Sequence, residues 1–150
     1  MTHENRKQTN CVIFHHSLSV SGDVDIIRQW HKARGFEDIG YHYVVIPIGD
    51  IQKGRDIRLV GAHSRDDGRN GDSIGVCLVG DMRRSGPTED QIQACSGLYH
   101  RLCRAYSKTL AIEFHRPVWM DNACPGKCLD RWYFTQKLME NDPYGDNEES

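Results

Sequence analysis

A chain of 150 residues is long enough for one domain with a single hydrophobic core, so we expect no second domain. The 19 Lys and Arg residues nearly balance the 21 Asp and Glu residues and form no long basic block, which argues against general nucleic-acid binding. No apolar run approaches the ~20 residues needed to span a bilayer, so we expect no role for a membrane.

The first predicted elements are a buried strand and an amphipathic helix. The strand, CVIFHHS at 11–17, contains β-branched and aromatic residues and ends in two histidines. In the helix that follows, Asp23 is a candidate N-cap, and Gly35 suits the left-handed position after the last turn. We expect Trp30 to lie in the core and His31 on the surface.

A hairpin and a central strand are predicted next. YHYVVIPIGD (41–50) is typical of a strand that ends in a Gly-Asp turn, and IQKGRDIRLV (51–60) is typical of the strand that returns. A loop at 61–72, rich in Gly, Asp, Asn and Arg, leads to SIGVCLVG at 73–80. Because this last segment is apolar without a break, we expect a strand that is buried on both faces.

The second half of the chain alternates helix and strand again. Residues 87–109 have apolar side chains at helical spacing, and Thr88 with Gln91 forms a capping-box pattern at the start of this helix. LAIEFH at 110–115 predicts the last strand, and a short helix is expected at 129–139.

This alternation predicts an α/β fold with one mixed central β-sheet of about five strands flanked by helices. The folded domain is expected to span residues 11–138. Residues 1–10 are predicted to be a flexible N-terminal arm, and residues 139–150 an acidic, disordered tail.

The cysteines and the N-terminus indicate synthesis in the cytoplasm. Six cysteines are compatible with a disulfide scaffold, but such scaffolds are usually shorter and poor in core residues. The first ten residues, MTHENRKQTN, lack the apolar segment of a signal peptide. We therefore expect free thiols in a reducing compartment.

Two histidines and a cysteine are candidates for a metal site. His15 and His115 each end a predicted strand, and the carboxyl ends of strands border the crevice in which open sheets tend to bind ligands. Cys124 precedes a Pro-Gly turn nine residues after His115. A catalytic zinc ion typically has three protein ligands and an open fourth position, which this set would provide.

The residue types alone leave other interpretations open. His15 and His115 could each be satisfied by a hydrogen bond, with no metal involved. His16 competes with His15, although neighbours on a regular strand point to opposite faces. Cys124 and Cys128 could belong to a structural zinc site, but the sequence contains no close Cys-x-x-Cys pair to support that site.

Five separated segments together resemble one known family. In chain order they are VIFHHS, IRQWHKARGFEDIGYHYVV, GRDIRLVGAHS, SIGVCLVGD and HRPVWMDNACPG. They are similar to the zinc-dependent N-acetylmuramoyl-L-alanine amidases of the phage lysozyme type, which are related to the peptidoglycan recognition proteins. The resemblance covers roughly residues 11–134 and implies an amidase fold.

The resemblance implies roles for individual residues. The family's three zinc ligands fall on His15, His115 and Cys124, so the implied cofactor is Zn²⁺. The family's catalytic tyrosine corresponds to Tyr41 in the GYH segment.

Further residues correspond to the family's substrate groove, with one departure. His63 in the GAHS segment and Asn70 in the following loop match groove positions of the family. Asn122 stands where many phage relatives have a lysine, two residues before the zinc cysteine, and the spacing from His115 to Cys124 is one residue longer. We expect activity to persist, because other members of the family lack that lysine.

The resemblance implies hydrolysis of the amide bond between N-acetylmuramic acid and L-alanine in peptidoglycan, as expected of a phage or prophage endolysin. We expect a monomer that is made without a signal peptide and acts on the cell wall after release. Two alternatives are a peptidoglycan-binding module without turnover and a lysozyme-like regulator that binds a protein partner.

Overall fold

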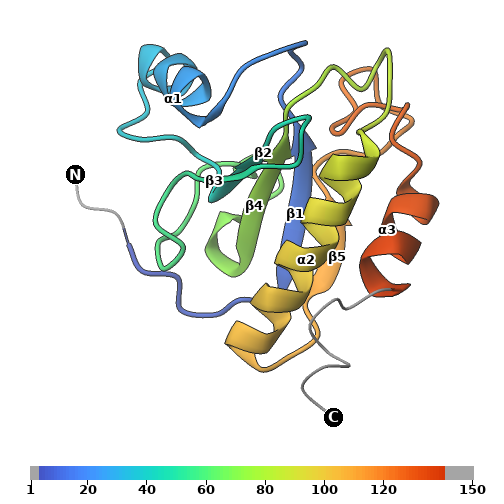
Figure 1. Ribbon diagram of the computed structural model, residues 1–150. Helices are drawn as coiled ribbons and strands as arrows, with labels where there is room; N and C mark the ends of the chain where they lie inside the picture. Colours follow the sequence, from blue (N-terminus) through green and yellow to red (C-terminus); the bar gives the residue numbers. More distant parts are fainter. Residues whose placement is uncertain (1–3, 141–150) are drawn as a thin grey trace.

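A five-stranded sheet in the order β3-β2-β4-β1-β5 forms the centre of the protein (Figure 1). The computed structural model describes residues 4–140. The strands are β1 (Cys11–His16), β2 (Tyr43–Val45), β3 (Ile51–Lys53), β4 (Ser73–Leu78) and β5 (Ala111–Phe114). Only β3 runs antiparallel to its neighbour, so the predicted mixed sheet of about five strands is confirmed.

The two central strands explain the long apolar segments in the sequence. Every residue of β1 and of β4 is buried, because the helices and loops cover both faces of the sheet at this point. The predicted hairpin is present but short, with Tyr43 paired to Lys53 and Val45 paired to Ile51. Gly49 has a φ of +95° in the turn between them, which suits glycine.

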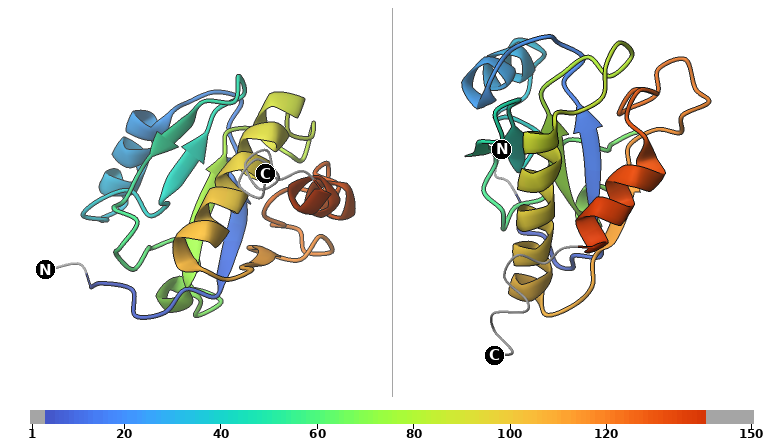
Figure 2. Two further views of the ribbon diagram at one scale, coloured as in Figure 1. Left: turned by 60° about the horizontal axis from the view of Figure 1, so that its bottom comes forward. Right: turned by 45° about the vertical axis from the view of Figure 1, so that its right-hand side comes forward.

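The three helices are divided between the two faces of the sheet. They are α1 (Val24–Ala33), α2 (Glu89–Tyr106) and α3 (Arg131–Glu140). Side chains of α2 and α3 pack with Val12, Phe14 and Val76 in the larger core, whereas Ile27 of α1 packs with Val44 and Cys77 on the opposite face. Figure 2 shows α2 and α3 together on one side and α1 on the other.

The helix starts follow the capping signals in the sequence. Asp23 accepts a hydrogen bond from the Ile26 N–H at 3.0 Å. Thr88 and Gln91 form the capping box, with both side-chain-to-backbone distances at 3.0 Å. Capping therefore sets both starting points locally.

The prediction for Trp30 and His31 is wrong. Trp30 is 42% exposed, whereas His31 is 7% exposed and its Nδ1 accepts the Gly40 N–H at 2.9 Å. The helix is rotated so that Ile27 and His31, four residues apart, form its buried stripe. The hydrogen bond to Gly40 allows a histidine to occupy this buried position.

The structure describes most of the predicted N-terminal arm but little of the predicted C-terminal tail. Residues 4–6 lie beside 58–60, where Asn5 pairs with Leu59 and the Arg6 side chain donates to the Leu59 carbonyl at 3.1 Å. The acidic tail predicted for 139–150 lies outside the described residues, except for its first two, which end α3. Within the described part of the chain, no helix combines the length and apolar character that crossing a bilayer requires.

We predict that His42 makes folding stability fall as the pH drops from 6.5 towards 4. Its Nδ1 accepts the Gly75 N–H at 3.0 Å and its Nε2 lies 2.8 Å from the Leu59 carbonyl, and burial lowers its pKa to about 4. Between these pH values the unfolded chain binds a proton that the folded protein does not, so acid favours unfolding by up to roughly 3 kcal/mol for this residue. Urea unfolding at several pH values measures this slope. The variant His42→Gln should have a shallower slope, and an unchanged slope would contradict the assignment.

Candidate active site

His15, His115 and Cys124 lie together at the carboxyl edge of the parallel strands. One potential ligand atom from each residue lies within 4.8 Å of the others. His15 Nδ1 is 3.9 Å from Cys124 Sγ, and the rings of His15 and His115 have centroids 4.6 Å apart. The three residues predicted as ligands are thus brought into one cluster, and none of them is more than 9% exposed.

Strand register and one loop bridge produce this cluster. Phe14 pairs with Phe114 in the parallel β1–β5 ladder, so the residues that follow, His15 and His115, emerge side by side. The loop after β5 then returns towards its own start, because the Arg116 N–H donates to the Cys124 carbonyl at 2.7 Å. Residues far apart in the sequence are therefore neighbours.

Asp66 orients the His115 ring. His115 Nε2 lies 2.7 Å from Asp66 Oδ1, and a carboxylate can only accept, so Nε2 carries the proton. His115 Nδ1 is buried and has no hydrogen-bond partner among residues 4–140. A carboxylate behind a histidine is the usual support of a metal ligand, and it leaves Nδ1 for the ion.

A chain of hydrogen bonds orients the His15 ring so that, as in His115, the proton lies on Nε2. The Ser73 hydroxyl donates to the Arg69 carbonyl at 2.6 Å, so towards His63 Nε2, 3.1 Å away, it acts as acceptor. His63 therefore has its proton on Nε2, and its Nδ1 accepts from His15 Nε2 at 2.9 Å. The network assigns the proton of His15 to Nε2, which leaves a lone pair on the Nδ1 that faces Cys124.

The electrostatics of the cluster agree with a neutral His15 ring and a protonated Cys124 thiol in the metal-free protein. Burial, with the neighbouring His63, holds the pKa of His15 well below its usual value. Burial also raises the pKa of the Cys124 thiol to about 11. A divalent cation would reverse this second effect, because a coordinating thiol loses its proton to the metal bond.

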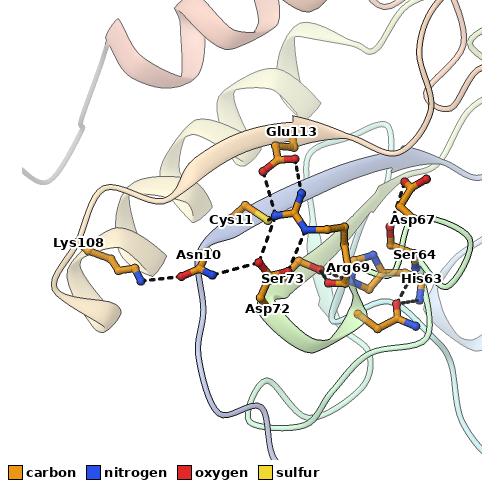
Figure 3. Close-up of polar contacts among 11 residues, drawn as sticks. Asn10, Cys11, His63, Ser64, Asp67, Arg69, Asp72, Ser73, Lys108 and Glu113 are labelled. Atoms are coloured by element: carbon orange, nitrogen blue, oxygen red, sulfur yellow. Dashed lines mark hydrogen bonds and ion pairs between the residues drawn. The ribbon is translucent and has the colours of Figure 1, made fainter.

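The loop that supplies this support is fixed to the sheet by Arg69. Figure 3 shows the Arg69 guanidinium between Asp72 and Glu113 of β5, at N–O distances of 3.1 and 2.7 Å. The same residue provides the carbonyl that accepts from Ser73. The ion pairs therefore hold the end of the hydrogen-bond chain in place.

A glycine on β4 makes room for His63. A Cβ atom on Gly75 would overlap the His63 ring, so the ring can rest on the sheet only because this position has no side chain. Asn70, predicted to bind substrate, accepts the backbone N–H groups of His63 and Ser64 at 3.0 and 2.6 Å. In the structure, Asn70 therefore stabilises the loop that carries His63.

A cavity of about 420 Å³ opens over the cluster. Its lining includes Cys124, His115, His63, Tyr41, Asn122 and, on the side of α1, His31, Arg34 and Phe36. Asn122, predicted in the substrate groove, is exposed on this lining. His63, predicted at the rim, is only 7% exposed and both of its ring nitrogens are engaged.

Tyr41, the predicted catalytic residue, lies beside His15 in the same cavity. The two ring centroids are 5.0 Å apart. Burial, together with the nearby Cys77 thiol, raises the pKa of Tyr41 well above its usual value, so the hydroxyl remains a hydrogen-bond donor.

The sequence alone did not identify Asp66, Ser73 or His31 as parts of the site. Asp66 is one of several acidic residues in the loop at 61–72, and no spacing distinguishes it from Asp67. Ser73 and His31 act through contacts with His63 and Gly40, which no helical or strand spacing in the sequence indicates. Only the three-dimensional arrangement reveals such roles.

These features define a hydrolase-like site with a candidate metal centre, and comparison with known proteins gives its class. The sequence profile of the N-acetylmuramoyl-L-alanine amidase family matches residues 5–127, so the chain belongs to that family. This match confirms the predicted family and, with it, the predicted enzyme class.

Individual relatives agree with this family assignment. The chain is 34% identical over 146 residues to the endolysin of Enterobacteria phage K11, covering 91% of this chain and 94% of that protein. It is also 34% identical over 145 residues to the endolysin of Escherichia phage T7, covering 91% and 93%. Among solved structures, the N-acetylmuramoyl-L-alanine amidase LysC from Clostridium intestinale superposes with a TM-score of 0.83 at 26% identity, covering 93% of this chain and 91% of that one. A mutant of Drosophila PGRP-LB in complex with tracheal cytotoxin gives a TM-score of 0.76 at 26% identity, covering 87% and 83%.

We predict that Ser73→Ala changes the protonated nitrogen of His15 without any contact between the two residues. Loss of the hydroxyl removes the acceptor for His63 Nε2, so His63 can move its proton to Nδ1, where it no longer accepts from His15. Imidazole ¹⁵N chemical shifts of the metal-free protein distinguish the two nitrogens. The expected result is a smaller fraction of His15 protonated on Nε2, while Ser96→Ala, a buried serine of α2, leaves that fraction unchanged. A His15 signal that is identical in Ser73→Ala would remove Ser73 from the chain.

Proposed function

We propose that the protein is a zinc-dependent N-acetylmuramoyl-L-alanine amidase that hydrolyses the amide bond between the lactyl group of N-acetylmuramic acid and L-alanine. The observation that carries this proposal is the buried cluster of His15, His115 and Cys124, with ligand atoms within 4.8 Å of one another, in a chain of this family. The cluster lies beneath a cavity large enough for part of a muramyl peptide.

The donor set fits zinc. Two imidazole nitrogens and one sulfur are ligands that Zn²⁺ favours, and three protein ligands are the usual number at a catalytic zinc. The unpartnered, buried His115 Nδ1 supports the proposal, since such an atom otherwise costs folding free energy. Asp66, Asp67 and His115 form another possible group, but its carboxylates are exposed and Asp66 already contacts His115 and Arg116.

Zinc bound by these residues would supply Lewis acidity, which activates water and polarises an amide carbonyl. The remaining work falls to the chain itself. Tyr41, whose ring lies beside His15 and whose hydroxyl stays protonated, can donate a hydrogen bond to the carbonyl oxygen as negative charge develops there. The cavity walls position the substrate. Asn122 contributes a neutral amide to this lining where many phage relatives have a lysine.

The endolysin relatives support a biological setting. We propose that the chain acts on bacterial peptidoglycan after release from the cell in which it is made. A wall-binding module without turnover would need the cavity but not three potential metal ligands buried together, two of them histidines held in place by His63 and Asp66. The enzyme is therefore preferred over the binding module.

Removal of the metal is expected to abolish activity reversibly. Purified protein incubated with peptidoglycan should release free stem peptides, a chelator should stop the release, and added zinc should restore it. Cys124→Ser should bind zinc at least about tenfold more weakly, while Cys128→Ser, an exposed cysteine of the same loop, should bind it normally. Stem-peptide release that continues after complete metal removal would refute the zinc proposal, and binding without release would favour the non-catalytic module.

Tyr41→Phe is expected to retain zinc and lose most turnover. Losing one donor to a developing oxyanion typically costs ~3 kcal/mol, or about 100-fold in kcat. Zinc content measured by mass spectrometry should stay at the wild-type level, and Tyr133→Phe on α3 serves as a matched control. Undiminished kcat in Tyr41→Phe would exclude this residue from the reaction.

A further inference from the structure

Two residues other than glycine have a left-handed backbone among residues 4–140. They are Leu18, with a φ of 62°, and Ser107, with a φ of 54°. Side chains rarely adopt this conformation, because the Cβ atom then lies too close to the following carbonyl oxygen. Ser107 ends α2, where a left-handed residue is a common way to close a helix. Leu18 lies in the loop between β1 and α1, so helix closure does not explain its strain.

Hydrogen bonds to the end of β4 impose this conformation on Leu18. The Leu18 N–H donates to the Gly80 carbonyl at 3.0 Å, and the Ser17 hydroxyl accepts the Gly80 N–H at 2.9 Å. The Ser17 N–H donates to the Leu78 carbonyl at 3.0 Å, so the pairing of β1 with β4 continues past the ends of both strands. A strained residue persists only where its surroundings hold it in this way.

The Leu18 side chain contributes little to the fold. It is 52% exposed and belongs to neither of the two core clusters in the described part of the chain. A glycine would adopt the same backbone without strain, as Gly49 and Gly68 do at their positive φ values. A leucine at this position therefore costs folding free energy, and backbone strain of this kind is concentrated at functional sites.

Leu18 lines the cavity over the candidate metal centre, three residues after His15. In Figure 1 its loop runs from the carboxyl end of β1 to α1. Among the described residues of that lining, Leu18 is the only large aliphatic one. The others are polar, charged or aromatic, apart from Cys124, Ala62 and Ala123. The cavity thus has a single aliphatic wall, and backbone strain holds it in place.

The scissile part of the proposed substrate suits an aliphatic contact. The amide joins a lactyl group to L-alanine, and a methyl group is attached to the carbon on each side of this amide. Methyl groups are recognised by burial against an apolar surface, and loss of one carbon in such a contact typically changes kcat/KM by about tenfold or more. An aliphatic wall in the cavity over the ligand cluster can supply this recognition.

We propose that Leu18 is a specificity-determining residue, whose side chain contacts the methyl groups that flank the scissile amide. The proposal rests on the proposed amidase function, which places this amide over the candidate metal centre. The strain at Leu18 is then the cost of holding an aliphatic side chain against the reacting part of the substrate.

Glycine at the two strained positions separates strain from function. Leu18→Gly and Ser107→Gly should each raise Tm by about 2–4 °C, because glycine adopts a positive φ freely. Ser107→Gly should leave kcat/KM on a muramyl peptide unchanged, whereas Leu18→Gly should lower it about tenfold. Leu18→Asn should lower it as much, because asparagine tolerates the left-handed region but offers no aliphatic surface. A Leu18→Gly protein that is less stable than the wild type and equally active would assign Leu18 to the fold and overturn the proposal.

A substrate without the two methyl groups tests the contact itself. It has a glycolyl ether in place of the lactyl group and glycine in place of L-alanine. Wild-type enzyme should hydrolyse the natural muramyl peptide with a kcat/KM at least about tenfold higher than this substrate, and Leu18→Gly and Leu18→Asn should bring that ratio close to one. The same ratio in the wild type and both variants would overturn the proposal, because a purely structural defect lowers both rates together.

Binding gives a second readout that does not need turnover. Analogues of both substrates with a methylene group in place of the amide nitrogen are not hydrolysed at this position. The wild-type protein should bind the analogue with the methyl groups about tenfold more tightly than the one without them, and Leu18→Gly should bind both equally. No preference in the wild-type protein would overturn the contact. If the wild-type protein hydrolyses neither substrate, the amidase proposal fails, while the binding ratio still tests Leu18.

Discussion

The parallel pairing of β1 with β4 and β5 is the constraint on which the site depends. Parallel strands end at the same edge, so His15 and His115 leave the sheet as neighbours although 100 residues separate them in sequence. The pairing also carries a cost, since both rings are then buried and need hydrogen-bond partners. The loop at 61–72 supplies them through Asp66 and His63, and this loop in turn depends on the Arg69 ion pairs and on the missing side chain at Gly75.

The two histidines are supported by different means that have the same result. His115 is backed by a partly exposed carboxylate, and His15 by a buried chain of neutral groups that ends at a backbone carbonyl. In both cases the proton is on Nε2 and Nδ1 points into the cluster. Neutral support suits the deeper residue, because a second buried carboxylate would be expensive to desolvate. Cys124, the third member, adds the only group that would gain negative charge on binding a cation.

Much of this arrangement could be predicted from the sequence. The buried apolar segments, the capping signals at Asp23 and Thr88 and the strand–helix alternation gave the elements correctly, because each depends on local pattern. Residue chemistry and family resemblance together singled out the members of the cluster. Local pattern failed at α1, where His31 rather than Trp30 is buried, because the partner that makes this tolerable, the Gly40 N–H, is not encoded in helical spacing. The sequence did not reveal the roles of Asp66 and Ser73 because their contacts with His115 and His63 are likewise absent from any local pattern.

The cavity over the candidate metal centre is bordered by α1 and by the loop after β5. The most direct test of that centre is a crystal structure of the full chain grown with zinc, with anomalous diffraction collected on both sides of the zinc absorption edge. We expect one strong peak per chain, bonded to His15 Nδ1, His115 Nδ1 and Cys124 Sγ at about 2.0–2.3 Å. Zinc bound instead by Asp66, Asp67 and His115, or no ordered zinc at this cluster, would contradict the account.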